Sequence, residues 1–514
     1  MMENEPNGWI SLKLGDICLV NPKLDKSTYE DNLLASFVPM PAVGAESGKI
    51  DVSQEKKIKE VKKGYTHFFK RDVLFAKITP CMENGKMAVV PTLKNNIGFG
   101  STEFHVLRAF NCISEYYLYY FVSSKKFRID AEHKMTGAVG QRRVPTSYLS
   151  NSLIPIPPLN EQHRIVTKIE ELFSKIDKGV ESLQKAKELL VLYRQSLLKH
   201  AFEGKLTEQW RKENPDKVIP ADELLEQIKQ ARESRYQQQL EEWESAVKLW
   251  ESEGKKGKKP SKPKKLTLFE FIPTDELNSF PVLPAGWTYT RLGYFIDSID
   301  AGKSFKCNEK EPQNDEIGVA KVSAITWGEY NEAESKTCTD LNQVNKAFFI
   351  KKEDFLFSRA NTIELVGAVV IVKDTTKKIM LSDKTLRINF LNLNKSYVLY
   401  YLRSKNGRKE IMYHSSGNQE SMRNIGQDRI RSILIPICSN EESTFIVELL
   451  SQKLSAIDKQ EQIIEQTLKQ SATLKQSILK KAFSGQLVPQ DPNDEPASVL
   501  LERIKAEKAR AGCN

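Results

Sequence analysis

The sequence predicts an α+β chain in which two globular domains are separated by a long antiparallel two-helix coiled coil, arranged as a pseudo-two-fold internal repeat. The first observation is a duplication, because the segment 153–206 recurs without a gap as 434–487. The second is that each copy carries a helical pattern far longer than an average helix. Two copies are too few for a solenoid, which needs at least three stacked repeats. We therefore expect one chain that imitates a dimer of similar halves.

The borders of the duplication divide the chain into six segments. They are a first globular domain (1–152), a first long helix with its leading segment (153–206), a polar helical insertion with a lysine-rich linker (207–284), a second globular domain (285–433), a second long helix (434–487) and a C-terminal tail (488–514). Short matches also link the globular domains: Gly8-Trp9 with Gly286-Trp287, Leu14-Gly15 with Leu292-Gly293, and Asp72–Lys77 with Asp354–Arg359. The remainder differs, so we expect a shared framework that carries two different surfaces.

Both long helices show apolar residues at heptad spacing. In the first helix the two series are Ile165, Leu172, Gly179, Ala186, Tyr193 and Ile169, Ile176, Leu183, Leu190, Leu197. In the second helix they are Leu450, Ile457, Ile464, Ile478 and Leu454, Leu468, interrupted by Lys453, Gln460, Glu461 and Ser471. A sustained period of 3.5 residues favours a coiled-coil seam. Only a second helix that returns along the first buries both seams, although two core helices of a single globular domain remain an alternative.

Composition limits the class of protein. The chain has 514 residues, 40% of them hydrophobic, which suffices for a core in each domain. It contains no run of about 18 apolar residues and begins with a polar, acidic segment, so we expect neither a membrane span nor a secretory signal, and a cytoplasmic location. Seven scattered cysteines without a Cys-x-x-Cys pair predict reduced thiols and no structural metal. The formal net charge of +10 suits a polyanionic partner without requiring one.

Several segments resemble those of one known family. They are Ile154–Gln162 with Ala201–Leu206, the second copies of both, Leu283–Trp287 and Phe99–Phe104. Together they resemble the specificity subunits of type I restriction-modification systems. The second copy departs from the family pattern at Cys438–Glu442, where the Pro-Pro-Leu-x-Glu-Gln form is missing, which puts the subunit contacts there in doubt.

The resemblance implies a non-catalytic reader of double-stranded DNA. Each globular domain would be a target recognition domain for one half of a bipartite, asymmetric target. The paired helices would act as a spacer and would dock two adenine-methylation subunits, which restriction subunits would join. The resemblance further implies that S-adenosylmethionine, ATP and Mg act in those partner subunits, with no cofactor in this chain.

Motifs for catalysis are missing from the sequence. We find no Asn/Asp-Pro-Pro-aromatic motif of an adenine methyltransferase and no phosphate-binding Gly-x-x-x-x-Gly-Lys-Ser/Thr loop. Gly98-Phe99-Gly100 is not followed by a helix of the nucleotide-binding kind, and six isolated histidines form no triad. We therefore predict no catalytic, cofactor or metal residue, and no enzymatic activity, in this chain.

Polar loops that follow expected strands and helices are the candidates for DNA contact. Side chains of Arg, Lys, Asn and Gln can form paired hydrogen bonds with base edges. The candidates are Lys77, Thr79, Asn84, Lys86, Ser101, Gln141, Arg142 and Arg143 in the first domain, and Ser358, Arg359, Asn361, Asn418, Gln419 and Arg423 in the second. For any one of them an exposed charge or a turn residue is the simpler interpretation. Lys255–Lys265 could bind phosphates, but its Gly and Pro residues favour a flexible linker.

Two further interpretations stay open. A coiled-coil scaffold with two protein-binding heads and no role on DNA would show the same duplication. Pro220–Glu226 is similar to Pro496–Glu502, which suggests paired docking segments for two copies of one partner.

Overall fold

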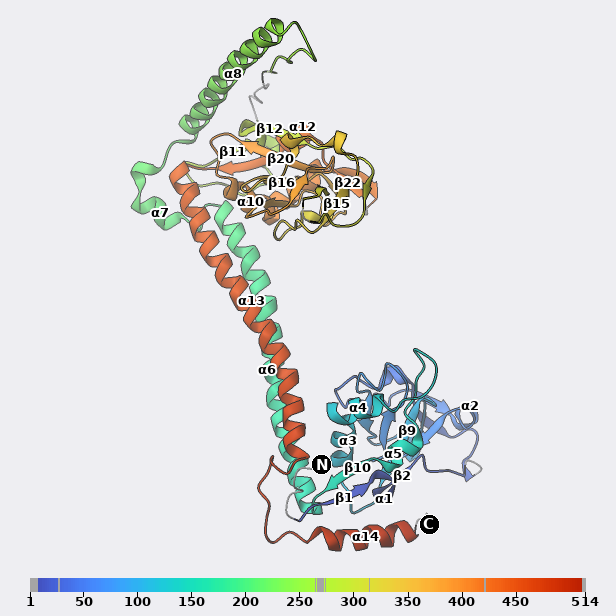
Figure 1. Cartoon of the computed structure of the whole chain (residues 1–514). Coiled ribbons are helices and arrows are strands. Elements are labelled where there is room, and N and C mark those ends of the chain that lie inside the picture. Colours follow the sequence, from blue (N-terminus) through green and yellow to red (C-terminus); the bar gives the residue numbers. More distant parts are fainter. Residues whose placement is uncertain are drawn as a thin grey trace. The chain divides into compact units, whose positions relative to one another are not determined.

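The computed structural model describes residues 8–25, 28–263, 265, 272, 274–313, 315–419 and 422–510. Its internal contacts divide the chain into two units, Met1–Lys185 with Ile463–Asn514, and Ala186–Gln462. Each unit contains one α+β domain together with a part of each long helix, α6 (Leu159–Phe202) and α13 (Asn440–Ala482). Figure 1 shows these elements. The predicted α+β organisation with paired long helices is confirmed. None of the described helices is long and apolar enough to cross a membrane.

The first domain is built on two four-stranded sheets, with the orders β2-β9-β6-β7 and β4-β3-β8-β5. The strands are β2 (Cys18–Val20), β3 (Leu34–Val38), β4 (Glu55–Lys57), β5 (Thr66–Phe68), β6 (Val73–Ala76), β7 (Met87–Val89), β8 (Gly98–Gly100) and β9 (Phe104–Ala109). The helices of this unit, besides the long ones, are α1 (Leu14–Ile17), α2 (Ile58–Val61), α3 (Glu115–Ser123), α4 (Lys125–Glu132), α5 (Thr146–Asn151) and α14 (Ala497–Arg510). In the second sheet β3 and β8 run parallel, whereas all other pairs are antiparallel.

The second domain repeats this plan with the sheets β12-β20-β16-β18 and β13-β15-β14-β19, and adds a small sheet β17-β22-β21. The strands are β12 (Ile296–Ala301), β13 (Cys307–Asn308), β14 (Ile317–Ala320), β15 (Ser335–Cys338), β16 (Phe355–Ser358), β17 (Ala360–Asn361), β18 (Val369–Ile371), β19 (Lys378–Met380), β20 (Thr385–Phe390), β21 (Ser416–Gln419) and β22 (Met422–Asn424). The shorter helices are α7 (Glu208–Glu213), α8 (Ala221–Ser252), α9 (Thr274–Leu277), α10 (Lys395–Arg403), α11 (Lys405–His414) and α12 (Gln427–Ser432).

The same junction joins each domain to the long helix that follows it. β1 (Ile10–Lys13) pairs with β10 (Leu153–Ile156), and β11 (Thr288–Arg291) pairs with β23 (Leu434–Ile437), both antiparallel. The hydroxyl of Tyr117 donates to the carbonyl of Pro155 at 2.8 Å, and that of Tyr397 donates to Pro436 at 3.0 Å. The duplication therefore extends to individual hydrogen bonds.

Within each unit the two long helices run antiparallel and lie side by side (Figure 1). In the first unit Lys475 forms an ion pair with Asp177 at 2.6 Å. In the second unit Arg194 forms ion pairs with Asp458 at 2.5 Å and Glu461 at 3.3 Å. Each pair joins the first half or the midpoint of one long helix to the second half of the other, which is the predicted return.

Each domain core is completed by the end of the long helix that starts from the other repeat. Phe483, just past α13, packs against Tyr117 and Phe121 of α3, with ring centres 5.2 Å apart in both cases. In the second unit Phe202 packs against Tyr397 and Tyr401 of α10 at 5.1 and 5.2 Å. These edge-to-face contacts bury large aromatic area, so each domain needs both long helices for its core.

The heptad prediction was wrong at two positions of α6. Gly179 and Tyr193 are exposed, the latter by 49%. The partly buried positions near them are Val180 and Arg194. A straight α-helix drifts about 20° per heptad from a 3.5-residue repeat, so one series shifts by one residue, whereas Ile176, Leu183, Leu190 and Leu197 of the other series stay at least partly buried. The seam residues predicted for α13 fit better, since Leu450, Leu454, Ile457, Ile464 and Ile478 are buried.

Candidate nucleic-acid interface

Three polar segments meet in the first domain. They are the loop 77–86 after β6, the turn 101–103 before β9, and the loop 136–144 after α4. The amide of Lys77 donates to the carbonyl of Glu103 at 2.9 Å, and the carbonyl of Lys77 accepts from Val144 at 2.9 Å. The amide of Thr79 donates to Arg142 at 3.0 Å. Main-chain hydrogen bonds thus join loops that the sequence analysis considered separately.

The second domain assembles the equivalent segments. The amide of Arg359 donates to the carbonyl of Lys384 at 3.0 Å, and its carbonyl accepts from Ile425 at 2.9 Å. β17, which follows Arg359, pairs with β22 in the hairpin after α11. We call these the reading clusters: 77–86, 101–103 and 136–144 in the first domain, and 358–367, 382–384, 415–419 and 422–425 in the second.

Some predicted residues of the first domain are available to a ligand. Asn84 and Gln141 are exposed. Arg142 is partly exposed and lies 3.7 Å from Glu132, a loose surface pair. Lys77 is partly buried, and the hydroxyl of Thr79 donates to the Glu83 carboxylate at 3.0 Å. Asn84, Gln141 and Arg142 are therefore the side chains of this cluster best placed to meet a partner.

Other predicted residues of this domain hold the cluster together. The Lys86 ammonium donates to the carbonyl of Met40 at 3.2 Å. Arg143 donates two hydrogen bonds to the Glu103 carboxylate, at 2.9 and 2.8 Å, and this lowers the pKa of Glu103. The hydroxyl of Ser101 accepts from the Glu103 amide at 3.2 Å. The structure thus gives Lys86, Arg143 and Ser101 internal partners that local sequence could not reveal.

In the second domain the predicted residues divide in the same way. Ser358 is fully buried and its hydroxyl accepts from the Asn361 amide group at 3.3 Å, so Ser358 has no surface to offer. Arg359 is partly exposed, with one long hydrogen bond of 3.4 Å to Asn424. Arg423 is engaged with the Ser415 hydroxyl at 2.9 Å. The main chain of Asn418 and Gln419 lies in β21, and their side chains lie outside the described residues.

Two residues of the second cluster were not among the predicted candidates. Lys384 and Asn424 lie directly beside Arg359, through the contacts given above. Lys384 takes the place that Glu103 has in the first domain, because each accepts the amide after the central strand. Matching β9 with β20 along the duplication would have revealed Lys384.

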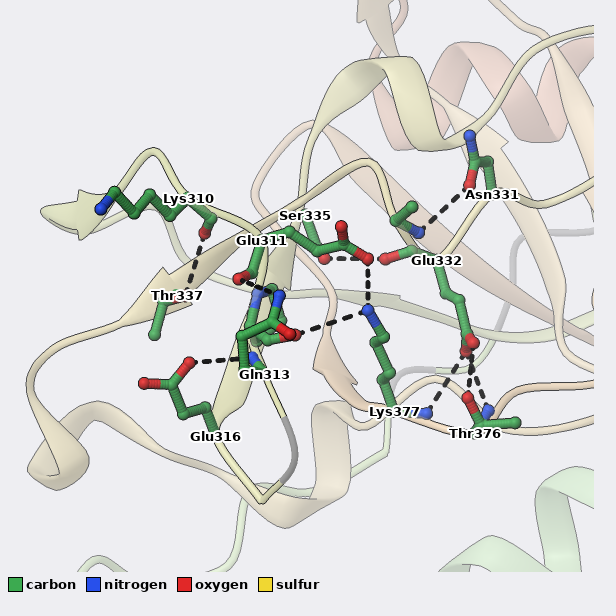
Figure 2. A network of polar contacts seen from close by, with 12 residues as sticks. Lys310, Glu311, Gln313, Glu316, Asn331, Glu332, Ser335, Thr337, Thr376 and Lys377 are labelled. Atoms are coloured by element: carbon green, nitrogen blue, oxygen red, sulfur yellow. Dashed lines mark hydrogen bonds and ion pairs between the residues drawn. The ribbon is translucent and has the colours of Figure 1, made fainter.

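A polar network in the second sheet of this domain fixes the segment before β19 (Figure 2). The Glu332 carboxylate accepts from the Thr376 amide at 2.8 Å and from its hydroxyl at 2.6 Å. Lys377 forms an ion pair with Glu311. Burial alone would raise the pKa of Glu332, but the hydrogen bonds from Thr376, Thr375 and Lys377 hold that pKa below its ordinary value.

The lysine-rich segment follows α8. The Lys262 ammonium lies 5.6 Å from the ring centre of Trp243, and that of Lys259 lies 6.0 Å from Trp250. The indole N–H of Trp243 donates to the carbonyl of Pro260 at 3.1 Å. Lys259 and Lys262, three residues apart, thus lie opposite Trp250 and Trp243, which are seven residues apart on α8. The two spacings agree, because three extended residues span about 9 Å and seven helical residues about 10.5 Å. This differs from the unstructured linker that its composition favours.

The two helices that begin in the predicted docking segments, α8 and α14, pack inside their own units. Leu224 of α8 belongs to the core of the second domain. Leu500 and Ile504 of α14 belong to the core of the first, and Lys508 pairs with Asp16 at 2.8 Å. Docking of a partner on these helices stays a prediction. Among the residues that the structure describes, no group of three or more His, Cys, Asp or Glu side chains could hold a metal ion.

Comparison with known proteins identifies the family. The model of the type I restriction modification DNA specificity domain matches residues 6–187 and 284–470. The EcoEI specificity subunit of Escherichia coli is 32% identical over 450 residues, covering 84% of this chain and 75% of that protein. The EcoAI specificity subunit is 36% identical over 318 residues, covering 59% and 53%. The HsdS subunit from Thermoanaerobacter tengcongensis shares the fold, with a TM-score of 0.56, 20% identity and coverage of 94% and 99%. The chain therefore belongs to the family of type I restriction-modification DNA specificity subunits.

Proposed function

We propose that this chain reads a bipartite, asymmetric sequence in double-stranded DNA, with one half of the target read by each domain. The observation that carries the proposal is the recurrence of the reading cluster on one framework with different exposed side chains. The first cluster presents Asn84, Gln141 and Arg142, and the second presents Arg359, whereas the side-chain amide of Asn361 donates to Ser358 and accepts from Thr362. These residue types form paired hydrogen bonds with base edges, so two unlike clusters suit two unlike half-sites.

The charge of the chain supports a polyanionic partner. A formal net charge of +10 favours a negatively charged partner such as DNA. Lysines contact phosphates without reading the base sequence. Binding should weaken steeply with salt, with a slope of about 0.9 per phosphate neutralised. Lys255–Lys265 would add to this term without adding specificity.

We further propose that the chain is a non-catalytic scaffold that works in the cytoplasm. Two adenine-methylation subunits and restriction subunits would assemble on it, and would supply the chemistry that requires S-adenosylmethionine, ATP and Mg. The family of the chain and the missing methyltransferase and ATP-binding motifs support this division of labour. The purified chain alone should therefore transfer no methyl group and hydrolyse no ATP.

The test is an exchange of one domain. Residues 285–433 would be replaced by the equivalent segment of a relative, and methylated adenines would be mapped across the host genome by long-read sequencing. One half of the methylated motif should change and the other should stay. Deleting the gene should remove the motif. An exchange that changes both halves, or neither, would contradict a separate reader in each domain.

A further inference from the structure

A buried arginine holds the main chain of the first reading cluster. Arg128 of α4 is 6% exposed, and its guanidinium donates to the carbonyl of Glu83, inside the loop 77–86. It also donates to the carbonyl of Ser123 at 3.1 Å and forms an ion pair with Glu46. The loop approaches so closely that a Cβ on Gly85, which has φ +64°, would lie 3.2 Å from an Arg128 nitrogen. The guanidinium thus ties this loop to helix α4.

The second domain has the same device. Arg408 of α11 donates to the carbonyls of Ile363 and Val366, in the equivalent loop. Its guanidinium lies 5.0 Å from the ring centre of Trp327, whose indole N–H donates to the carbonyl of Glu364 at 2.7 Å. Three carbonyl oxygens of this loop, those of Ile363, Glu364 and Val366, therefore accept from the guanidinium or from the indole beside it.

The helices that carry these arginines are also equivalent. The hydroxyl of Ser124 caps α4 by accepting from Phe127 at 3.4 Å, and that of Ser404 caps α11 by accepting from Gly407 at 3.2 Å. Each arginine lies in the first turns of its helix, and each helix leads at its other end into the second loop of the reading cluster. One short helix therefore positions two of the three segments.

We propose that Arg128 and Arg408 are positioning residues for DNA reading, each fixing the loop of one half-site through main-chain carbonyls. The inference rests on the proposed function. Because carbonyl oxygens are present whatever the side chains, such an anchor holds the loop while its sequence changes. A guanidinium can bridge several acceptors in a fixed fork, which a lysine cannot.

The first test measures loop order without DNA. The amides of Met82, Asn84, Gly85 and Lys86 are hydrogen-bonded within the loop, so they exchange with deuterium when the loop opens. In the full chain, Arg128→Gln should speed their exchange by about 10- to 100-fold, the factor expected when one or two charge-assisted hydrogen bonds are lost. Arg408→Gln should do the same for the amides of Leu365, Val366 and Gly367, which are hydrogen-bonded within the equivalent loop, and should leave those of the first loop unchanged. Arg128→Lys, which keeps the charge beside Glu46, should give an intermediate rate and covers the case in which the glutamine variant does not fold.

The control is Arg108→Gln. Arg108 pairs with the buried Asp72 at 2.7 Å in the main sheet of the first domain and lies outside the loop. This variant should lower the melting temperature of the first unit while leaving the loop amides as slow as the rest of the domain. If Arg128→Gln and Arg108→Gln give the same exchange pattern, Arg128 is only a stabilising residue and the proposal fails.

The second test maps adenine methylation in a host that carries each variant gene. Arg128→Gln should relax one half of the motif by about tenfold or more in preference over altered bases, Arg408→Gln should relax the other half, and Arg108→Gln should keep both. Lower methylation with an intact motif in all three variants would overturn the positioning role. A host whose motifs survive deletion of the gene would refute the proposed function itself, while the exchange rates would still decide whether the arginines anchor the loops.

Discussion

Replacing each of two tyrosines on α10 by phenylalanine should change the free energy of unfolding in opposite directions. The hydroxyl of Tyr401 on α10 is buried and contacts no hydrogen-bond partner among the described residues. Burial raises its pKa well above the ordinary value for tyrosine. At the equivalent place in the first domain stands Phe121, which meets Phe483 as Tyr401 meets Phe202. The equivalent ring contact in the first domain thus forms between two phenylalanines, without a hydroxyl.

The size of the effect follows from desolvation. Burying a hydroxyl without a hydrogen bond costs about 1–3 kcal/mol. Tyr401→Phe should therefore raise the free energy of unfolding of the second unit by about 1 kcal/mol. Tyr397→Phe removes a hydrogen bond of 3.0 Å to the carbonyl of Pro436 and should lower it by about 1–2 kcal/mol.

The assay is urea unfolding of the full chain followed by pulsed hydrogen exchange. A chain of two units need not unfold in one two-state step, so exchange should be read from peptides of α10 and β23 rather than from a global signal. Tyr117→Phe in the first unit is the matched control for Tyr397→Phe, since its hydroxyl bonds to Pro155 at 2.8 Å. Loss of stability in Tyr401→Phe equal to that in Tyr397→Phe would refute the argument, because it would mean that the Tyr401 hydroxyl has a partner.

Three further predictions concern charged and aromatic contacts. Glu442→Gln should lower the free energy of unfolding of the second unit by about 3 kcal/mol, because Arg211 loses its buried, charged partner. Glu161→Gln should lower that of the first unit by less than about 1 kcal/mol, because an amide oxygen can still accept from Trp9. Unfolding curves that show equal losses for the two variants would contradict this. The pKa of Glu332 is lowered in the folded chain, so its contribution should be full above the ordinary carboxyl pKa and lost as pH falls through the lower folded value. Melting of the second unit should then show a weaker acid dependence in Glu332→Gln. Trp243→Ala should release the lysine-rich segment, so that trypsin cuts after Lys256 and Lys258, which are not followed by proline, about tenfold faster while the second domain stays folded. Unchanged cleavage would exclude a role for the aromatic contacts.

The sequence predicted the framework better than the site, for a physical reason. Residues of the repeat such as Trp9 and Trp287 recur because each must fill the same place beside a buried carboxylate, Glu161 or Glu442. The heptad assignment failed at Tyr193, where the true helical period had drifted away from the assumed one. Periodicity therefore locates a long helix more securely than it locates each seam residue.

Candidate DNA contacts could not be ranked from local sequence. Lys86 and Arg143 look like free cations in the sequence, yet the first reaches the carbonyl of Met40 and the second the carboxylate of Glu103. Both partners are distant in sequence, and an N–H that donates inside the fold is not available to a base edge. Asn84 and Gln141, which lie in the same polar, glycine-containing loops of the sequence, are exposed. Only the tertiary contacts separate the two groups.

The contacts that recur between the domains are mostly those that fix the main chain. Asp72 accepts from the Phe69 amide at 2.8 Å and pairs with Arg108, and Asp354 accepts from the Lys351 amide at 2.8 Å and pairs with Arg387. Each aspartate closes the turn that leads into a strand of the main sheet, β6 or β16. The exposed side chains of the clusters, by contrast, differ in charge and in hydrogen-bonding groups. Because the anchors act on amides and carbonyls, a domain of this kind can change the side chains it presents without losing the loop geometry, which lets one duplicated framework carry two different surfaces.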